Sequence, residues 1–447
     1  MLFSDSSRSS SFRTSRIGIL LGLGFALYVY RFSVGDANIT VLRIATLILG
    51  ICLLLAISRS ERKLSPNYWM LSIGIAVLVF INVLWYFSLE EYPIPQREMI
   101  SHLANLLLML EIVIWINTER QLIFVLNGYL LGAVVAVVIG YYAFFFKEIP
   151  LEELLRIYGA TSAENMIYVI EDGDFLRLSG PFMDPNFFGI YLLTVIIYSL
   201  WMYHFRSRNK FYLILALVSL GTLPLTISRT AMVGLIVFFS VYVIWLSRRS
   251  RILVIISSSA FLMLAILAVF IFYGDFLDRM LDSESAFERI HFIFRGFEAF
   301  EANPFFGSGP ASIVDESTGI ATAHLMYLSI FAKFGLVGAV PYFVFIFYPL
   351  WRVIAHRRLF LREYRFLIIG LYLPLFFMYF LYDFLYFLEF QYLIFAVGYS
   401  IVLSSFAKNQ QFRVINGRDN RSSVQKQLQQ MDGKIYAEKG ALIRVQG

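Results

Sequence analysis

The sequence predicts an all-α polytopic membrane protein with about twelve transmembrane helices. Of its 447 residues, 59% are hydrophobic and only 15% are charged, and the mean hydropathy is +0.71. A soluble chain usually has about 25% charged residues. Apolar runs of about 20 residues recur, which is the length that crosses a hydrocarbon core about 30 Å thick. A β-barrel would instead give shorter, alternating segments.

The apolar runs define twelve predicted spans. They are 17–34, 40–57, 67–87, 99–117, 121–146, 183–204, 211–227, 230–246, 252–273, 323–351, 366–385 and 388–406. The first is not a signal peptide, because a second span follows it at once. We expect a basic tail at 1–16, a transmembrane catalytic domain at 17–406 and a polar tail at 407–447.

The distribution of charge predicts the orientation of the spans. If the N-terminus is cytoplasmic, more than two thirds of the 37 Lys and Arg residues fall on the inner side, with fewer than a quarter of the 31 Asp and Glu residues. Basic loops face the cytoplasm, so we expect both termini there. The net charge of +6 then reflects topology and anionic lipid, and we expect no nucleic-acid partner.

Two long connections, 147–182 and 274–322, are predicted to face outward and to carry interfacial helices. Apolar residues in the first recur at helical spacing over 151–158, and those in the second do so over 287–297. NPFFGSGP (303–310) should then end the second helix. Gly307 and Gly309 could turn backbone N–H groups toward an anion.

Several catalytic motifs are missing from the sequence. It has no GxxxxGK[ST], HExxH or GxSxG pattern and a single cysteine, Cys52. We therefore expect neither a cofactor nor a metal. The acidic EDGD stretch (171–174) is the one cluster that could bind a metal, and we interpret it as solvated.

Three polar stretches on the predicted outer side carry the candidate chemistry. FLRLSGPFMDPNFFG (175–189) offers Arg177, Asp184 and Asn186. Asp184 or Asn186 could equally be the N-cap of the sixth span, with Pro185 in its first turn. Arg177 could equally be an arginine that extends to the head groups.

The second stretch, TLPLTISRTAMVG (222–234), has almost no loop between two spans. Ser228 and Arg229 should lie at the apex of a tight hairpin. An arginine at the centre of a bilayer costs at least about 2.5–3.5 kcal/mol, so Arg229 should face water or an anion. The alternative is an arginine that reaches the outer head groups.

The third stretch places Arg289 in the loop helix and His324 at the start of the next span. Histidine moves protons near neutral pH, although a histidine at a span end is often only a hydrogen-bonded interface residue. Several arginines and one base would suit a pyrophosphate substrate, because the guanidinium fork matches phosphate oxygens.

The ordered stretches RLSGPFMDPNFFG, SRTA, ERIHF…ANPFFGSGP and AHLMYLSIFAKFGLVG resemble the O-antigen ligase and Wzy-type polysaccharide polymerase superfamily of bacterial inner membranes. The resemblance covers roughly 175–345. It implies a GT-C-like membrane fold and a metal-independent, inverting glycosyltransferase that uses an undecaprenyl-pyrophosphate-linked oligosaccharide on the outer face of the inner membrane. By position, Arg177, Arg229 and Arg289 would bind the pyrophosphate and His324 would be catalytic, supported by Asp184, Asn186, Ser228, Gly307 and Gly309. Leu325 after the histidine and Glu288 before Arg289 depart from the family pattern.

The resemblance leaves two acceptors open. A polymerase extends another lipid-linked repeat and would work beside a flippase and a chain-length regulator. A ligase transfers the chain to lipid A–core. We favour a polymerase of an exopolysaccharide or O-antigen. A flippase is the alternative from another class, but it should show two related halves. A non-catalytic membrane scaffold is a further alternative.

Overall fold

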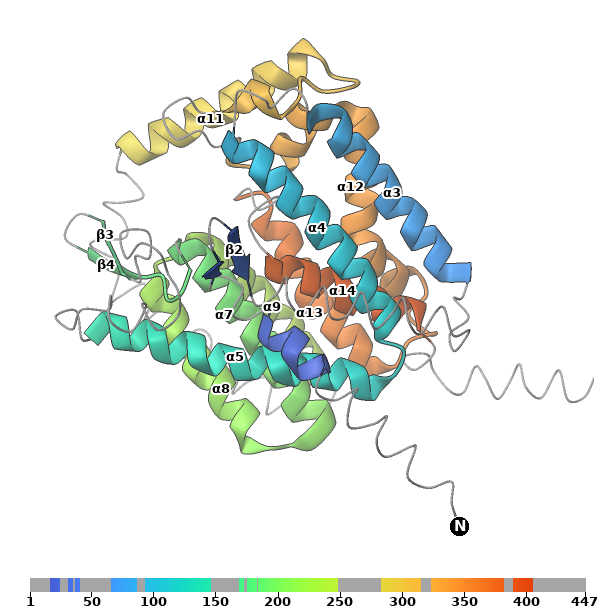
Figure 1. Ribbon diagram of the computed structural model, residues 1–447. Helices are drawn as coiled ribbons and strands as arrows, with labels where there is room; N and C mark the ends of the chain where they lie inside the picture. The colour runs from blue at the N-terminus through green and yellow to red at the C-terminus, as the bar shows by residue number, and fades with distance from the viewer. Residues whose placement is uncertain are drawn as a thin grey trace, which may run out of the picture.

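The computed structural model describes residues 17–24, 31–34, 37–40, 66–86, 93–145, 169–172, 175–182, 184–247, 283–314, 323–381 and 389–404. Figure 1 shows these residues as a helical assembly with α11 lying across one end. The α-helices are α3 (Pro66–Tyr86), α4 (Pro93–Trp115), α5 (Glu119–Phe145), α7 (Pro185–Met202), α8 (Lys210–Thr222), α9 (Arg229–Ser247), α11 (Ser283–Ala302), α12 (Met326–Ala355), α13 (Arg362–Met378) and α14 (Glu389–Leu403). Shorter helical turns are η3 (Tyr203–Ser207), η4 (Leu223–Thr226) and η5 (Pro310–Ile313).

Nine of the predicted spans correspond to the labelled helices α3, α4, α5, α7, α8, α9, α12, α13 and α14, and residues 17–24 of the first predicted span are also helical. Among the described residues, four helices are long and apolar enough to cross a membrane: Glu119–Tyr142, Pro185–Ser207, Arg229–Leu246 and Met326–Ala355. The helical membrane class is therefore supported, whereas the number twelve stays a prediction. Spans 40–57 and 252–273 lie almost wholly outside the described residues, as do the predicted helix at 151–158 and both tails.

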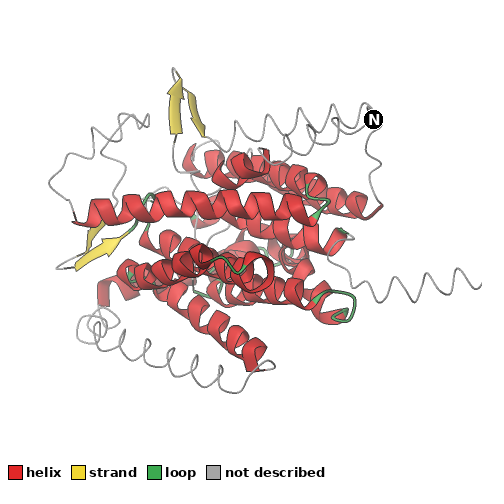
Figure 2. Cartoon of the chain, turned by 90° about the horizontal axis from the view of Figure 1, so that it is seen from below, coloured by secondary structure: helices red, strands yellow, loops and turns green. Residues whose placement is uncertain are grey.

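Two short antiparallel hairpins interrupt the helical pattern. Strand β1 (Arg31–Val34) pairs with β2 (Ala37–Thr40), and β3 (Val169–Asp172) pairs with β4 (Phe175–Leu178). Both project from the helical body in Figure 2. The first predicted span, 17–34, is therefore too long at its C-terminal end. Glu171 and Asp172, the first two residues of the acidic EDGD stretch, end β3.

Helix α12 is folded back on itself at Gly335. This glycine has φ 61° and ψ −170°, a conformation that is essentially restricted to glycine. Aromatic side chains before and after it meet in antiparallel order, at centroid distances of 4.9 Å for Phe334–Tyr342, 5.3 Å for Phe331–Phe343 and 6.4 Å for Tyr327–Phe347.

The predicted span at 323–351 overlaps a stretch, Met326–Ala355, that is long and apolar enough to cross a membrane, but its helix is broken at Gly335. Residues 326–334 form a short helix about 13 Å long, and 336–355 form one of about 30 Å at 1.5 Å per residue. Only the second is long enough to cross a bilayer. His324 therefore lies just before the short half-helix and not at the start of the crossing helix.

The NPFFGSGP segment forms hydrogen bonds with the backbone N–H and C=O groups that lose their helical partners at Gly335. Ser308 N donates to Ala332 O at 2.9 Å and Gly309 N to Lys333 O at 3.2 Å. In the other direction, Leu336 N donates to Pro304 O at 2.9 Å and Val337 N to Phe305 O at 3.0 Å. Irregular backbone inside a membrane protein persists only where it is satisfied in this way. The glycine-bearing segment thus has a structural role that its sequence does not reveal.

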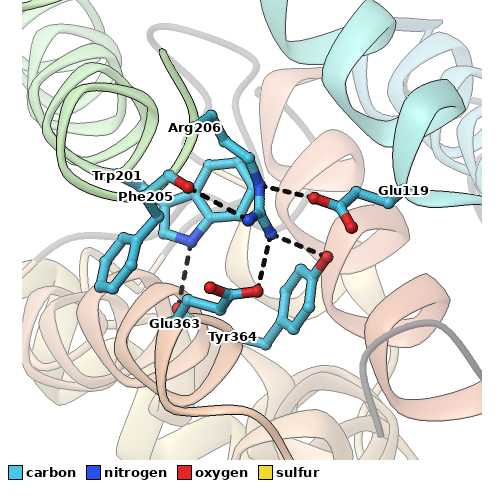
Figure 3. Close-up of polar contacts among 6 residues, drawn as sticks. All are labelled: Glu119, Trp201, Phe205, Arg206, Glu363 and Tyr364. Carbon is cyan, nitrogen blue, oxygen red and sulfur yellow. Dashed lines mark hydrogen bonds and ion pairs between the residues drawn. The ribbon is translucent and has the colours of Figure 1, made fainter. Parts of the chain in front are cut away.

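A cluster of polar side chains joins helices at the end of the bundle away from α11 (Figure 3). Arg206, in the η3 turn that follows α7, pairs with Glu119 at 2.9 Å and with Glu363 at 3.0 Å. Its guanidinium lies 4.6 Å from the Trp201 ring centroid and donates to the Tyr364 hydroxyl at 2.9 Å. The start of α5, the end of α7 and the start of α13 are joined there.

Candidate functional site

The candidate residues gather at one end of the bundle, which we call the site end. Here α5, α8 and α13 finish, α7, α9 and α14 begin, and α11 lies across α12 (Figure 1). This arrangement brings together segments that are far apart in the sequence. The candidates form an arginine side and a histidine side.

On the arginine side, Arg177 reaches from β4 to the apex of the α8–α9 hairpin. Its Nε donates to Thr226 O at 3.3 Å, and Thr226 is fully buried in η4. Arg229 is the first residue of α9, three positions further on. The predicted tight hairpin is confirmed, and Arg177 lies against the same apex that carries Arg229. Both arginines are half-buried.

The apex has a strained backbone. Ile227 has φ 50°, which is a genuine outlier for a β-branched residue. Ser228 then caps the helix, because Ala231 N donates to its Oγ at 3.2 Å. The strained turn lets α9 begin at Arg229, so a guanidinium stands at a helix N-terminus. Both the guanidinium and the helix dipole favour an anion there.

The start of α7 packs against the same apex. Asp184 is the N-cap and accepts from Asn186 N at 2.7 Å, with Pro185 in the first turn, as the capping interpretation predicts. One turn later, a Cβ on Gly189 would lie 2.8 Å from the Ala231 Cβ and 2.9 Å from the Ser228 Cβ. Glycine therefore allows the close approach. Asp184 and Asn186 also bond to each other through Asn186 Nδ2 at 2.9 Å.

On the histidine side, His324 itself has a left-handed backbone, with φ 57°. Its ring packs against Phe292 of α11 at a centroid distance of 4.6 Å. On either side, Ala323 N donates to Ser329 Oγ at 2.9 Å and Met326 N to Tyr379 O at 3.1 Å. These contacts hold an unfavourable conformation, which costs about 1–3 kcal/mol in a non-glycine residue.

The end of α13 joins the two sides. A Cβ on Gly234, one turn beyond Arg229, would lie 2.6 Å from Met378 Sδ, so α9 and α13 are in close contact there. The next residue, Tyr379, is fully buried and accepts from Met326 N with its carbonyl. Residues 378–379 therefore link the N-terminal part of α9 to the start of the half-helix that follows His324.

Three predicted site residues remain, namely Arg289, Gly307 and Gly309. Arg289 lies on α11, but its side chain is outside the described part of the structure. The N–H groups of Gly307 and Gly309 donate to Asn303 O at 2.8 Å and to Lys333 O at 3.2 Å. They therefore do not face an anion, and any support they give the site acts through the position of the loop. Within the described residues, no group of three His, Cys, Asp or Glu side chains could hold a metal.

Sequence reasoning missed two ionisable residues within predicted spans. His102 on α4 is 2% exposed, and Lys333 on the half-helix is fully buried. An ionisable residue inside an apolar run is itself a signal of function, and this signal was present at both positions.

Comparison with known proteins gives one finding. Residues 214–343 match the model of the O-antigen ligase family. The matched segment runs from α8 into α12 and includes Arg229, Arg289 and His324, whereas Arg177, Asp184 and Asn186 lie before it. No curated protein matches the chain. The family match confirms the resemblance to the O-antigen ligase-like superfamily and supports, at the family level, a ligase- or polymerase-like membrane enzyme that uses a lipid-linked glycan.

Proposed function

Taking the chain as an O-antigen ligase-like membrane enzyme, we propose that it is a metal-independent, inverting glycosyltransferase. Its donor is an oligosaccharide on undecaprenyl pyrophosphate, and it works on the outer face of a bacterial inner membrane with both termini in the cytoplasm. Of the two acceptors, we propose another lipid-linked repeat, which makes the protein a polymerase of an exopolysaccharide or O-antigen.

The observation that carries this proposal is the location of backbone strain. Among the described residues, only Arg208, Ile227 and His324 are non-glycine residues with positive φ. Arg208 ends the η3 turn after α7, where a left-handed residue is common. Ile227 lies two residues before Arg229, and His324 is itself the candidate base. Strained backbone persists where the surrounding structure enforces it, and it clusters at functional sites.

In this reaction the arginines and His324 would have different roles. Arg177, Arg229 and Arg289 would bind the donor pyrophosphate and stabilise its charge as it leaves. His324 would accept the proton of the acceptor hydroxyl while that oxygen attacks the anomeric carbon from the opposite face. The new C–O bond forms as the bond from the anomeric carbon to the pyrophosphate oxygen breaks, which inverts the anomeric configuration. The proton on His324 then returns to solvent.

Purified protein in liposomes, supplied with lipid-linked oligosaccharide, tests this proposal. Glycans of several repeats should form from the donor alone. Transfer that requires added lipid A–core would identify a ligase and would contradict the acceptor we propose. Movement of donor across the bilayer without a new glycosidic bond would identify a flippase and overturn the enzyme assignment.

A further inference from the structure

A buried chain of polar side chains crosses the bundle beneath the site end. Asn82 Nδ2 donates to Leu78 O at 2.8 Å and also to the Tyr342 hydroxyl. The Tyr342 hydroxyl lies 3.1 Å from His102 Nε2, and His102 Nδ1 is hydrogen-bonded to the Tyr392 hydroxyl. All four side chains are buried. The chain joins α3, α12, α4 and α14, with His102 at its centre.

A tyrosine hydroxyl has one proton and two lone pairs, and the Tyr342 oxygen accepts from Asn82 Nδ2. Of the two tautomers that the geometry allows for His102, we assign the one in which Tyr342 donates to Nε2. The neutral imidazole then carries its proton on Nδ1 and donates it to Tyr392. His102 thus needs an acceptor at one ring nitrogen and a donor at the other.

The chain continues to the histidine side of the site. Gln391, next to Tyr392 on α14, donates through Nε2 to the Tyr379 hydroxyl at 3.4 Å. The backbone carbonyl of the same residue, Tyr379, accepts from Met326 N at 3.1 Å. A cavity of about 10 Å³, room for about one water, is bordered by His102, Met326, Gln391 and Tyr392 among other residues. His102 and the residue that begins the half-helix therefore border the same space.

We propose that His102 is a positioning residue for His324. This inference rests on the proposed function. The His102–Tyr392 bond fixes the first turn of α14, Gln391 fixes Tyr379, and the Tyr379 carbonyl fixes Met326 directly after the left-handed turn at His324. Without the Nδ1 donor, the first turn of α14 shifts and His324 leaves its position opposite the arginines.

A matched pair of variants separates this role from simple space filling. In His102→Asn the amide nitrogen takes the place of Nδ1 and keeps the bond to Tyr392. In His102→Gln the amide oxygen takes the place of Nε2 and keeps the bond to Tyr342 but not the one to Tyr392. Polymer formation should stay near the wild-type rate in His102→Asn. In His102→Gln, kcat should fall about 10- to 100-fold, the loss expected for a displaced catalytic group, with KM for the donor unchanged.

If His102 only fills space, His102→Gln should be more active than His102→Asn, because glutamine is closer to histidine in size. That result would overturn the proposal. His204 provides the control. Its Nε2 is 2.7 Å from the Tyr242 hydroxyl near the opposite end of the bundle. His204→Asn and His204→Gln should both keep wild-type kinetics.

Two further measurements separate failure of this inference from failure of the proposed function. Adding His102→Gln to His324→Ala should cause no further loss, because both act on one group, whereas fully additive losses contradict the proposal. The second measurement is the rate at which diethyl pyrocarbonate modifies His324, determined by mass spectrometry of the full chain. This rate should change in His102→Gln and not in His102→Asn. If it is unchanged in both, the positioning role is excluded whatever the activity of His324→Ala.

Discussion

Gly307 and Gly335 face each other with no side chain between their backbones. A Cβ on Gly307 would lie 2.5 Å from Gly335 N, and a Cβ on Gly335 would overlap Gly307 N in the same way. Both glycines also have positive φ, at 78° and 61°. This contact lets the 303–309 segment satisfy the broken backbone of α12.

Replacing either glycine should unfold this end of the bundle. We expect Gly307→Ala and Gly335→Ala each to cost about 2–5 kcal/mol, since strained φ and overpacking act together. Thermal unfolding in detergent measures the loss. Gly221→Ala is the control, because that glycine lies on α8 with nothing within 4 Å of its Cβ position. Unchanged stability in Gly335→Ala would show that α12 does not fold back there.

The predicted orientation can be tested with single cysteines. After Cys52→Ser, we expect Glu301→Cys on α11 to react with a membrane-impermeant thiol reagent added to intact cells. Arg357→Cys, between α12 and α13, should react only after the membrane is opened. Both positions are exposed in the structure, so a difference in labelling reports the side of the membrane. Labelling of Arg357→Cys in intact cells would reverse the topology.

The Arg206 cluster should contribute to stability rather than to chemistry. Arg206 has a side chain only 13% exposed and two carboxylate partners. Arg206→Ala should therefore cost about 1.5–3 kcal/mol, the range for hydrogen bonds to charged groups. Arg206→Lys should recover part of this, because it keeps the charge but not the fork. Arg358→Ala, an exposed arginine, should change the unfolding midpoint little. If activity per folded molecule falls in Arg206→Ala, the cluster also serves the site.

Activity should survive removal of divalent metals. The proposed arginines supply the positive charge that a metal would otherwise give a departing pyrophosphate. Polymer formation measured in excess EDTA should equal that in its absence. If turnover stops in EDTA and magnesium or manganese restores it, the acidic EDGD stretch (171–174) becomes the first candidate for a metal site.

Composition and hydrophobic periodicity predicted most of the helices, because a membrane helix needs a long apolar run and little else. The same pattern could not reveal the fold of α12. Residues 326–355 are mostly apolar, and Gly335 is one of two glycines within them. Its special role depends on the partner segment at 303–309, which lies far from it in the sequence. The two β-hairpins were missed because four-residue strands carry almost no periodic signal.

In the candidate site, the sequence predicted those features that depend on residues close together in the chain. The capping role of Asp184 and the tight turn before Arg229 follow from residues within a few positions of each other. The link from the N-terminal part of α9 to the half-helix after His324, through Met378 and Tyr379, depends on tertiary packing, so it could not be predicted. The proposed roles of the arginines and His324 remain predictions.

The most direct test of the central claim is polymer formation by Arg229→Ala and His324→Asn from purified lipid-linked donor. Asparagine tolerates a left-handed backbone, so His324→Asn removes the imidazole without the strain that alanine would introduce. His291→Asn on the exposed face of α11 is the matched control and should keep full activity. We expect Arg229→Ala to abolish polymer at normal protein levels. His324→Asn should reduce turnover about 100- to 10,000-fold, as for loss of a general base. Wild-type turnover in both variants would contradict the account and place the reaction elsewhere in the protein.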